Sequence, residues 1–408
     1  MEQVLYKLPG GWEWHSVKKL SHNIQYGHTA KAESNGNAKF LRITDIQDGK
    51  IDWQGVPTVS LEEKEISKYA LNDDDLIFAR SGATAGKSIL IKSAPKDAVF
   101  ASYLIRIVPN QEKILPEYLS YFFLTPTYWN VVSQNAAGAA QPNINGTKLS
   151  EFIVPIAPYR EQKRIVEKLD VLLTHIDTAI EHLQESIILA DALYASSLDQ
   201  VFEKVYLNYP TQPLSALASK IGSGATPKGG QKAYKKSGIS LIRSLNVYDS
   251  EFKPEGLAFI DDDQAEKLSN VVVEAGDVLL NITGASIARC CIAPDEYLPA
   301  RVNQHVCIIR PTEAINSIYL NYLLISPKFK AALLFIGAGG ATRQALTKVM
   351  VSNLEIPLPP LEVQTELVGK VNLLSQKNRT LKEQVNSKIS DLIILKASIL
   401  DSAFKGEL

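Results

Sequence analysis

Polar side chains gather in four short segments of the 408-residue chain that also carry glycine or proline or lie next to glycine. The segments are Ser81-Gly-Ala-Thr84, Gln141-Pro-Asn143-Ile-Asn145, Thr283-Gly-Ala-Ser286 and Thr342-Arg343-Gln344. Their groups suit nucleobase edges, because Asn and Gln pair bidentately with adenine and Arg with guanine. Hydroxyls bind phosphates as well. For any one of these residues, a satisfied turn or a structural ion pair explains the pattern equally well.

Two arginines strengthen this hypothesis by their placement. Arg42 and Arg243 both follow apolar strand residues, and Asp45 and Asn246 stand three positions later. A nearby acid-free segment, Lys228–Lys236, supplies a local basic patch. The candidate nucleic-acid-binding residues are Arg42, Asp45, Arg80, Ser81, Thr84, Lys87, Gln141, Asn143, Lys228, Arg243, Asn246, Asn281, Thr283, Arg343 and Gln344.

Gly82-Ala-Thr-Ala-Gly86-Lys87-Ser88 approaches a phosphate-binding P-loop but departs from it. The loop needs four residues between its glycines and a helix after its lysine. Here the spacing is one residue short, and Ser88-Ile-Leu-Ile-Lys92 predicts a strand. A nucleotide-hydrolysing enzyme is therefore the weaker interpretation, and it predicts that Lys87→Ala abolishes turnover.

Other catalytic and metal-binding patterns are lacking. The six histidines pair with no cysteine or carboxylate at a ligand spacing, and Cys290, Cys291 and Cys307 match no zinc pattern. The acidic runs Asp73–Asp75 and Asp261–Asp263 are better explained as solvated turns than as metal sites. We therefore expect a binding protein with no catalytic residue, no metal and no cofactor of its own.

Composition is that of an ordinary globular protein, with 45% hydrophobic and 21% charged residues. A net charge of −1 argues weakly against a nucleic-acid partner, although a local basic patch is sufficient for one. No run of about 18 apolar residues predicts a membrane span. The few cysteines fit a reducing compartment, so a cytoplasmic location is expected.

The chain repeats itself. Asp75-Leu-Ile-Phe-Ala79 corresponds to Asp277-Val-Leu-Leu-Asn281, an offset of 277 − 75 = 202 residues. The same offset relates Gly138 to Gly340 and Gln162 to Gln364, whereas the residues between such anchors diverge. A duplicated domain whose variable regions differ suggests two copies of one binding domain, each of which recognises a different target.

Each copy combines a strand-rich block with one long helix. Alternating apolar runs such as Lys39–Thr44 and Ser102–Val108 predict strands, and Pro116 opens a predicted helix. The resulting fold class is α+β, with two mixed domains and two long helices related by a pseudo-twofold axis. The predicted boundaries are 1–158, 159–204, 205–360 and 361–408.

Apolar residues recur every three or four positions in both long helices, for example at Ile165, Leu169, Leu172 and Ile176. Helices of roughly 60 Å are too amphipathic to stand alone in water. An antiparallel coiled coil between them is the favoured arrangement. The alternative is that each helix packs only on its own domain.

The chain resembles the specificity (S) subunit of type I restriction–modification enzymes over nearly its full length. The residues that carry the resemblance are Pro155-Ile-Ala-Pro-Tyr-Arg-Glu-Gln162, Pro357-Leu-Pro-Pro-Leu-Glu-Val-Gln364 and the terminal Ser398–Leu408. Gly138–Asn145 and Gly340–Leu346 also fit its pattern. Tyr159-Arg160 stands where the second copy has Leu361-Glu362, so the two helix starts differ.

The resemblance implies two target recognition domains that read the halves of a split, asymmetric DNA site. It also implies docking of two methyltransferase (M) subunits and of restriction (R) subunits, which bring S-adenosylmethionine, ATP and Mg. The expected docking residues are Gln162, Ile165, Phe202, Gln364, Leu367 and Phe404. A coiled-coil scaffold that binds proteins without reading DNA remains the alternative, and it predicts no salt-dependent affinity for DNA.

Overall fold

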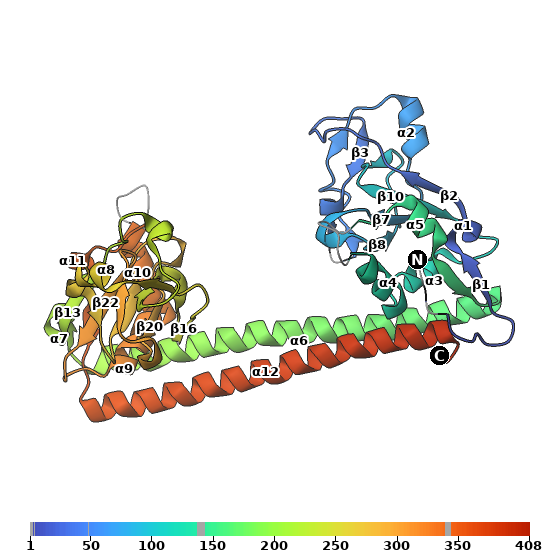
Figure 1. The fold of residues 1–408 in the computed structure, drawn as a ribbon. Coiled ribbons are helices and arrows are strands. Elements are labelled where there is room, and N and C mark those ends of the chain that lie inside the picture. The colour runs from blue at the N-terminus through green and yellow to red at the C-terminus, as the bar shows by residue number, and fades with distance from the viewer. Residues whose placement is uncertain (1–2, 4, 48, 137–142, 339–343) are drawn as a thin grey trace. The chain divides into compact units, whose positions relative to one another are not determined.

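The structure is a computed structural model that describes residue 3 and residues 5–47, 49–136, 143–338 and 344–408. The chain divides into two units. Unit 1 contains Met1–Leu183 and Asn386–Leu408, and unit 2 contains Gln184–Val385. The long helices α6 (Tyr159–Asn208) and α12 (Leu361–Lys405) contribute residues to both units (Figure 1). Both helices begin where the sequence predicted, and α6 runs four residues beyond the predicted 204.

The strands of unit 1 are β1 (Glu13–Ser16), β2 (Ser21–Tyr26), β3 (Ala38–Leu41), β4 (Ile46–Gln47), β5 (Lys50–Ile51), β6 (Thr58–Val59), β7 (Leu76–Ala79), β8 (Ser88–Leu90), β9 (Ala98–Phe100), β10 (Leu104–Pro109) and β11 (Ile153–Ile156). Its shorter helices are α1 (Val17–Leu20), α2 (Glu63–Tyr69), α3 (Pro116–Phe122), α4 (Pro126–Ala136) and α5 (Gly146–Glu151). The main sheet is antiparallel, in the order β2-β10-β7-β8. A second sheet, β6-β3-β9, contains the parallel pair β3 and β9.

The strands of unit 2 are β12 (Thr211–Pro213), β13 (Ala218–Ser223), β14 (Ile239–Ile242), β15 (Val247–Tyr248), β16 (Glu251–Phe252), β17 (Ala258–Ile260), β18 (Val272–Val273), β19 (Val278–Asn281), β20 (Cys290–Ile292), β21 (Ala300–Val302), β22 (Val306–Pro311) and β23 (Glu355–Pro357). Its shorter helices are α7 (Leu214–Leu217), α8 (Asp262–Glu266), α9 (Ser317–Ile325), α10 (Pro327–Ala338) and α11 (Lys348–Ser352). The main sheet, β13-β22-β19-β20, repeats the order found in unit 1. The second sheet, β17-β14-β21-β18, has one more strand than its counterpart.

The registers confirm the duplication. Leu104 lies opposite Ala79 in unit 1, and Val306 lies opposite Asn281 in unit 2. Both members of this pair are shifted by the same offset of 202 residues that relates Asp75 to Asp277. The two main sheets therefore share strand order and pairing as well as sequence anchors.

Each unit closes its core on a long helix. In unit 1 the aromatic rings of Tyr118 and Phe404 lie 4.8 Å apart, and both side chains are buried. In unit 2 the rings of Tyr319 and Phe202 lie 5.6 Å apart in the equivalent place. The tyrosine hydroxyls donate to Pro155 O and Pro357 O respectively. Burial of these apolar faces explains the apolar stripe of each long helix.

Within each unit the two long helices pair in opposite directions. In unit 1, Arg164 donates to Leu408 O and Lys396 pairs with Asp177 at 2.6 Å. Residue numbers therefore increase along one chain segment while they decrease along the other, as in an antiparallel pair. In unit 2, Asp191 accepts from Lys382 at 2.9 Å and from Asn378 at 3.0 Å. The antiparallel coiled coil predicted from the sequence is therefore present in both units.

Candidate functional site

Equivalent loops follow β7 in unit 1 and β19 in unit 2, and their backbones match bond for bond. Arg80 N donates to Tyr103 O, as Ile282 N does to His305 O. Ala79 N donates to Lys87 O at 2.9 Å, and Asn281 N donates to Arg289 O at 2.8 Å. The loops pass through the short 3-10 turns η2 (Gly82–Thr84) and η6 (Gly284–Ser286). Residues 80–87 and 282–289 are called the matched loops below.

The next-to-last residue of each matched loop, Gly86 or Ala288, has a left-handed backbone conformation. Gly86 has φ +88° and Ala288 has φ +65°. A left-handed conformation costs a residue with a Cβ about 1–2 kcal/mol, and Ala288 accepts it although its side chain is fully buried. The turn has therefore kept its shape in unit 2 even where the glycine is absent.

A groove of about 760 Å³ opens beside the matched loop of unit 2. The Arg289 guanidinium lies 4.5 Å from the centre of the Tyr248 ring, and Lys253 Nζ lies 4.2 Å from the same ring. Such cation–π contacts hold a guanidinium over a flat surface while leaving its N–H groups available to a ligand. The groove is lined by Ser244, Leu245, Tyr248, Thr283, Gly284, Ala285, Ser286, Arg289, His305, Gln344 and Ala345.

A connected set of hydrogen bonds begins at the groove-lining residues Thr283 and His305. Thr283 Oγ1 pairs with His305 Nδ1, and His305 Nε2 lies 3.2 Å from Gln304 Nε2. Gln304 is also bonded to Thr226. Unit 2 thus presents hydroxyl, imidazole and amide groups next to a guanidinium, which is a set able to contact both bases and phosphates.

The matched loop of unit 1 keeps most of these residue types but begins with Arg80 where unit 2 has Ile282. Lys87 is exposed, and Arg80 lies 5.2 Å from the centre of the Tyr26 ring. Ser81 forms an isolated bridge with Asn143, as Thr283 does with Ala345 in unit 2. The backbone geometry and the small polar residues are shared, whereas the arginine that lies over a tyrosine is Arg80 in unit 1 and Arg289 in unit 2.

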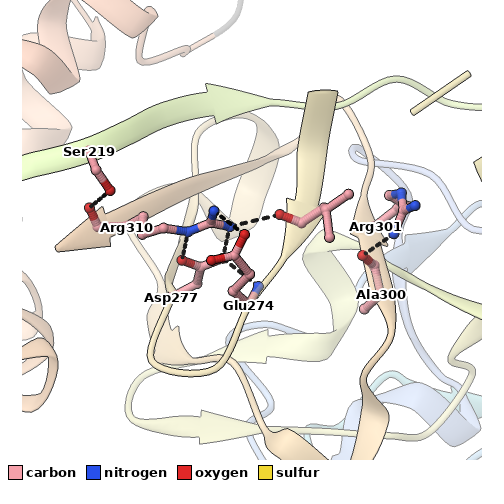
Figure 2. A network of polar contacts seen from close by, with 7 residues as sticks. Ser219, Glu274, Asp277, Ala300, Arg301 and Arg310 are labelled. Atoms are coloured by element: carbon pink, nitrogen blue, oxygen red, sulfur yellow. Dashed lines mark hydrogen bonds and ion pairs between the residues drawn. The ribbon is translucent and has the colours of Figure 1, made fainter. Parts of the chain in front are cut away.

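A partly buried ion-pair network lies at the end of β19 and β22 opposite to the matched loop (Figure 2). Arg310 donates to both carboxylate oxygens of Asp277, at 2.8 and 2.9 Å, and also to Glu274 and to Val272 O. The hydrogen bonds that Arg310 donates to Asp277 raise the pKa of Arg310. The network ties β22, whose first residue follows His305, to β18 and to the turn before β19.

The family described as "Type I restriction modification DNA specificity domain" matches residues 17–187 and again residues 218–391. The chain belongs to this family. The matched loops lie inside the two copies of the specificity domain.

Relatives extend this likeness along nearly the whole chain. The type I restriction enzyme EcoKI specificity subunit of Escherichia coli is 24% identical, over 98% of this chain and 90% of that protein. The StySPI specificity subunit of Salmonella potsdam is 26% identical over the same shares. A solved chain described as "Structural basis underlying complex assembly and conformational transition of the type I R-M system" has a TM-score of 0.75 and 20% identity, covering 99% of this chain and all of that one. This last likeness shows the shared fold.

Several predicted binding residues are engaged inside their own specificity domain. The Arg42 guanidinium donates to both carboxylate oxygens of Asp45, at 3.0 and 2.7 Å, and Arg243 donates to Gly256 O. Asn246 and Asn281 are fully buried. The Asn281 amide donates to Ser244 O, which joins the matched loop to the preceding turn. The structure places these side chains as supports of the loops, and any contact of theirs with DNA stays a prediction.

The other binding candidates lie at or near the loops. Ser81, Thr84, Lys87 and Thr283 are in the matched loops, Asn143 bridges to Ser81, and Gln344 lines the groove. Lys228 is exposed in the turn before the 3-10 turn Gly230–Ala233. Gln141 and Arg343 lie outside the described residues.

The predicted docking residues are mostly internal. Gln162 Oε1 accepts from Leu115 N at 2.9 Å, and its Nε2 donates to Ala157 O at 2.9 Å and to Lys113 O. Gln364 repeats the pattern with Asn316 N, Pro359 O and Ala314 O. Ile165, Phe202 and Phe404 are buried, whereas Leu367 is partly exposed and lines a groove between α6 and α12. The glutamines fasten each long helix to its domain, and their contact with a partner stays a prediction.

Sequence reasoning missed Arg289, Tyr248, His305 and Tyr103. Applying the 202-residue offset to Lys87 would have found Arg289, and applying it to Tyr103 would have paired that residue with His305. The stacking of Arg289 on Tyr248 has no sequence signal, because it depends on which face of a two-residue strand the tyrosine occupies.

Several chemical alternatives find little support in the described residues. Strand β8 follows Lys87, as predicted, where a P-loop requires a helix. The described residues contain no group of three or more His, Cys, Asp or Glu side chains arranged to hold a metal. Burial raises the pKa of Cys291 and Cys307 to about 12, so these thiols stay protonated at neutral pH. In the described ranges no single helix is long and apolar enough to cross a membrane, although the bent pair α9 and α10 meets the length and composition condition.

Proposed function

We propose that this chain is the DNA-reading specificity subunit of a type I restriction–modification complex. Each specificity domain reads one half of a bipartite, asymmetric DNA site. The observation that carries the proposal is a shared backbone at the matched loops with unlike side chains beside it, since Gln47 and Tyr103 in unit 1 correspond to Tyr248 and His305 in unit 2. Two copies of one scaffold with different functional groups suit a target whose two halves differ in sequence.

We further propose that the long helices dock two methyltransferase subunits and restriction subunits in the cytoplasm. Those partners supply S-adenosylmethionine, ATP and Mg together with the chemistry. This chain binds DNA and positions the partners without a catalytic residue of its own. The exposed apolar residues of α6 and α12 support docking, because Ile188, Leu193 and Ile394 are each more than 60% exposed.

Methylation mapping of DNA from cells that express the chain with its methyltransferase partner tests this proposal. We expect a split motif with methylated adenines that disappears when the chain is deleted. Replacing residues 1–158 by the same region of a relative should change one half of the motif and leave the other intact. Methylation that is unaffected by the deletion would favour the protein-binding scaffold, whose affinity for DNA should not depend on salt.

A further inference from the structure

One position in the matched loops keeps its charge while its surroundings change. Lys87 and Arg289 are related by the 202-residue offset, and each is the last residue of its loop. Lys87 N donates to Thr84 O at 2.9 Å, and Arg289 N donates to Ser286 O at 3.2 Å. Together with the matching bonds to Ala79 and Asn281, these contacts place the two Cα atoms equivalently on their sheets.

The described residues give neither cation a counterion. No carboxylate among them forms an ion pair with Lys87 or with Arg289, whereas Arg42 pairs with Asp45 and Arg310 with Asp277. The Lys87 side chain is exposed, and Arg289 is held flat against Tyr248. A cation without a counterion suits an anionic ligand, and Arg289 also lines the open groove of unit 2.

The side chains around this position differ in chemical type. Tyr103 in unit 1 corresponds to His305 in unit 2, and both accept the same backbone bond from the matched loop. Gln47, at the end of β4, corresponds to Tyr248 at the end of β15. An amide and a phenol in one copy thus stand where a phenol and an imidazole stand in the other.

We infer that Lys87 and Arg289 each bind a DNA phosphate at equivalent places in the two half-sites, while the residues at positions 47 and 103 and at positions 248 and 305 select the bases. This division rests on the proposed function. Phosphates are identical at every step of a duplex, so one charge serves both copies, whereas bases differ and require different side chains. Arginine offers a planar fork and lysine a compact point charge, and a phosphate group binds either of them.

The test measures affinity and salt dependence separately. The full chain in complex with its methyltransferase partner is titrated with a duplex carrying the mapped motif and with duplexes altered in one half. We expect Lys87→Ala and Arg289→Ala each to weaken binding by about three- to tenfold on every duplex alike. Each should also reduce the slope of log K against log salt by about one.

Charge-retaining variants and paired cations serve as controls. Lys87→Arg and Arg289→Lys should restore most of the affinity and the salt slope, which also shows that the loops fold. Lys92→Ala and Lys328→Ala remove cations that pair with carboxylates, Lys92 with Asp74 and Glu117 and Lys328 with Glu203, and should change the slope little. Tyr103→His and His305→Tyr should alter the preferred bases of their own half-site and leave the salt slope unchanged.

The possible outcomes separate a failure of the proposed function from a failure of the phosphate assignment. A wild-type complex with no preference for a mapped motif would remove the proposed function itself. A normal wild type whose Arg289→Ala variant loses base preference in one half, with an unchanged salt slope, would overturn the phosphate assignment alone. An unaltered affinity and slope in both alanine variants would overturn it equally.

Discussion

The two copies of the specificity domain are alike where they meet the long helices and unlike in the side chains that surround their matched loops. Gln162 and Gln364 make the same three hydrogen bonds, and Tyr118 and Tyr319 donate to equivalent proline carbonyls. At the loops the backbone bonds and the small polar residues are shared, but the neighbouring side chains are not, since Gln47 and Tyr103 correspond to Tyr248 and His305. The attachment of a domain to its helix depends on buried groups that must all be satisfied, so few residue types fit there. Loop side chains meet no such condition, so their identities are free to follow a ligand.

A third class of position lies between these two extremes. Asp75 and Asp277 are equivalent by the 202-residue offset, but their arginine partners are not, because Arg106 and Arg310 differ by 204 residues. Arg310 holds Asp277 with two bonds, whereas the closest contact from Arg106 to Asp75 is 3.6 Å. Each copy therefore pairs the equivalent buried carboxylate with an arginine from a different sequence position.

The largest expected effect comes from removing Arg310. In Arg310→Ala the fully buried Asp277 is left without its counterion, which should lower the free energy of unfolding by about 3–5 kcal/mol. The loss should be confined to unit 2. Urea unfolding combined with hydrogen exchange of peptides from each unit measures it.

Arg106→Ala is the matched control in unit 1, and we expect a smaller loss. Burial raises the pKa of Asp75, and this shift outweighs its hydrogen bond from Asn72 and its contact with Arg106. A carboxyl group with a raised pKa escapes an unpaired charge by taking up a proton more readily. Equal losses in the two variants would show that the difference in pairing has no energetic consequence.

Alanine at Gln162 or Gln364 should have the next largest effect. Each substitution leaves one backbone N–H and two carbonyl groups without partners at the start of a long helix, at a cost of about 2–3 kcal/mol. Because the bonds are the same in both units, the two losses should agree closely. Gln200→Ala removes an exposed glutamine from α6 and should change stability by less than about 0.5 kcal/mol. Unequal losses at the two glutamines would break the equivalence of the two attachments.

Much of the fold could be predicted because the sequence patterns that mark strands and helices occur twice, at an offset of 202 residues. The strand at Asp75–Ala79, the helix at Pro116 and the starts of both long helices were all placed within one residue or at the residue itself. Proline, β-branched runs and the apolar stripe of a helix act locally, so a single sequence carries them. The same offset predicts that the two main sheets are equivalent, but the strand pairing itself is seen only in the structure.

The site was less accessible to sequence reasoning. Arg42 and Asp45 looked like two separate ligands, yet they form a bidentate pair, and Asn281 points into the core instead of the groove. In a strand, the direction of a side chain alternates with each residue, so one position decides between core and surface. The contact of Arg289 with Tyr248 joins segments about 40 residues apart and leaves no local pattern.

The smallest expected effect concerns the coiled coil, where Lys382 and Asn378 hold Asp191 in unit 2 and Lys396 alone holds Asp177 in unit 1. Burial by itself would raise the pKa of Asp191, but the bonds from Asn378 and Lys382 outweigh it and hold the pKa below its usual value of 3.8. A carboxyl group whose pKa is lowered by folding stabilises the folded state above its unfolded pKa, and this contribution is lost as the pH falls through the folded pKa.

Asp191→Asn should therefore cost a few tenths of a kcal/mol at neutral pH, since half of the side chain is exposed and solvent screens the pair. The thermal unfolding curves of variant and wild type should converge only when the pH falls below the lowered folded pKa of Asp191, where the carboxyl group is protonated in both states. High salt should shrink the difference at neutral pH. Asp177→Asn, with one partner fewer, should cost less still, and a larger loss there would mean that the extra amide in unit 2 adds nothing to the helix pairing.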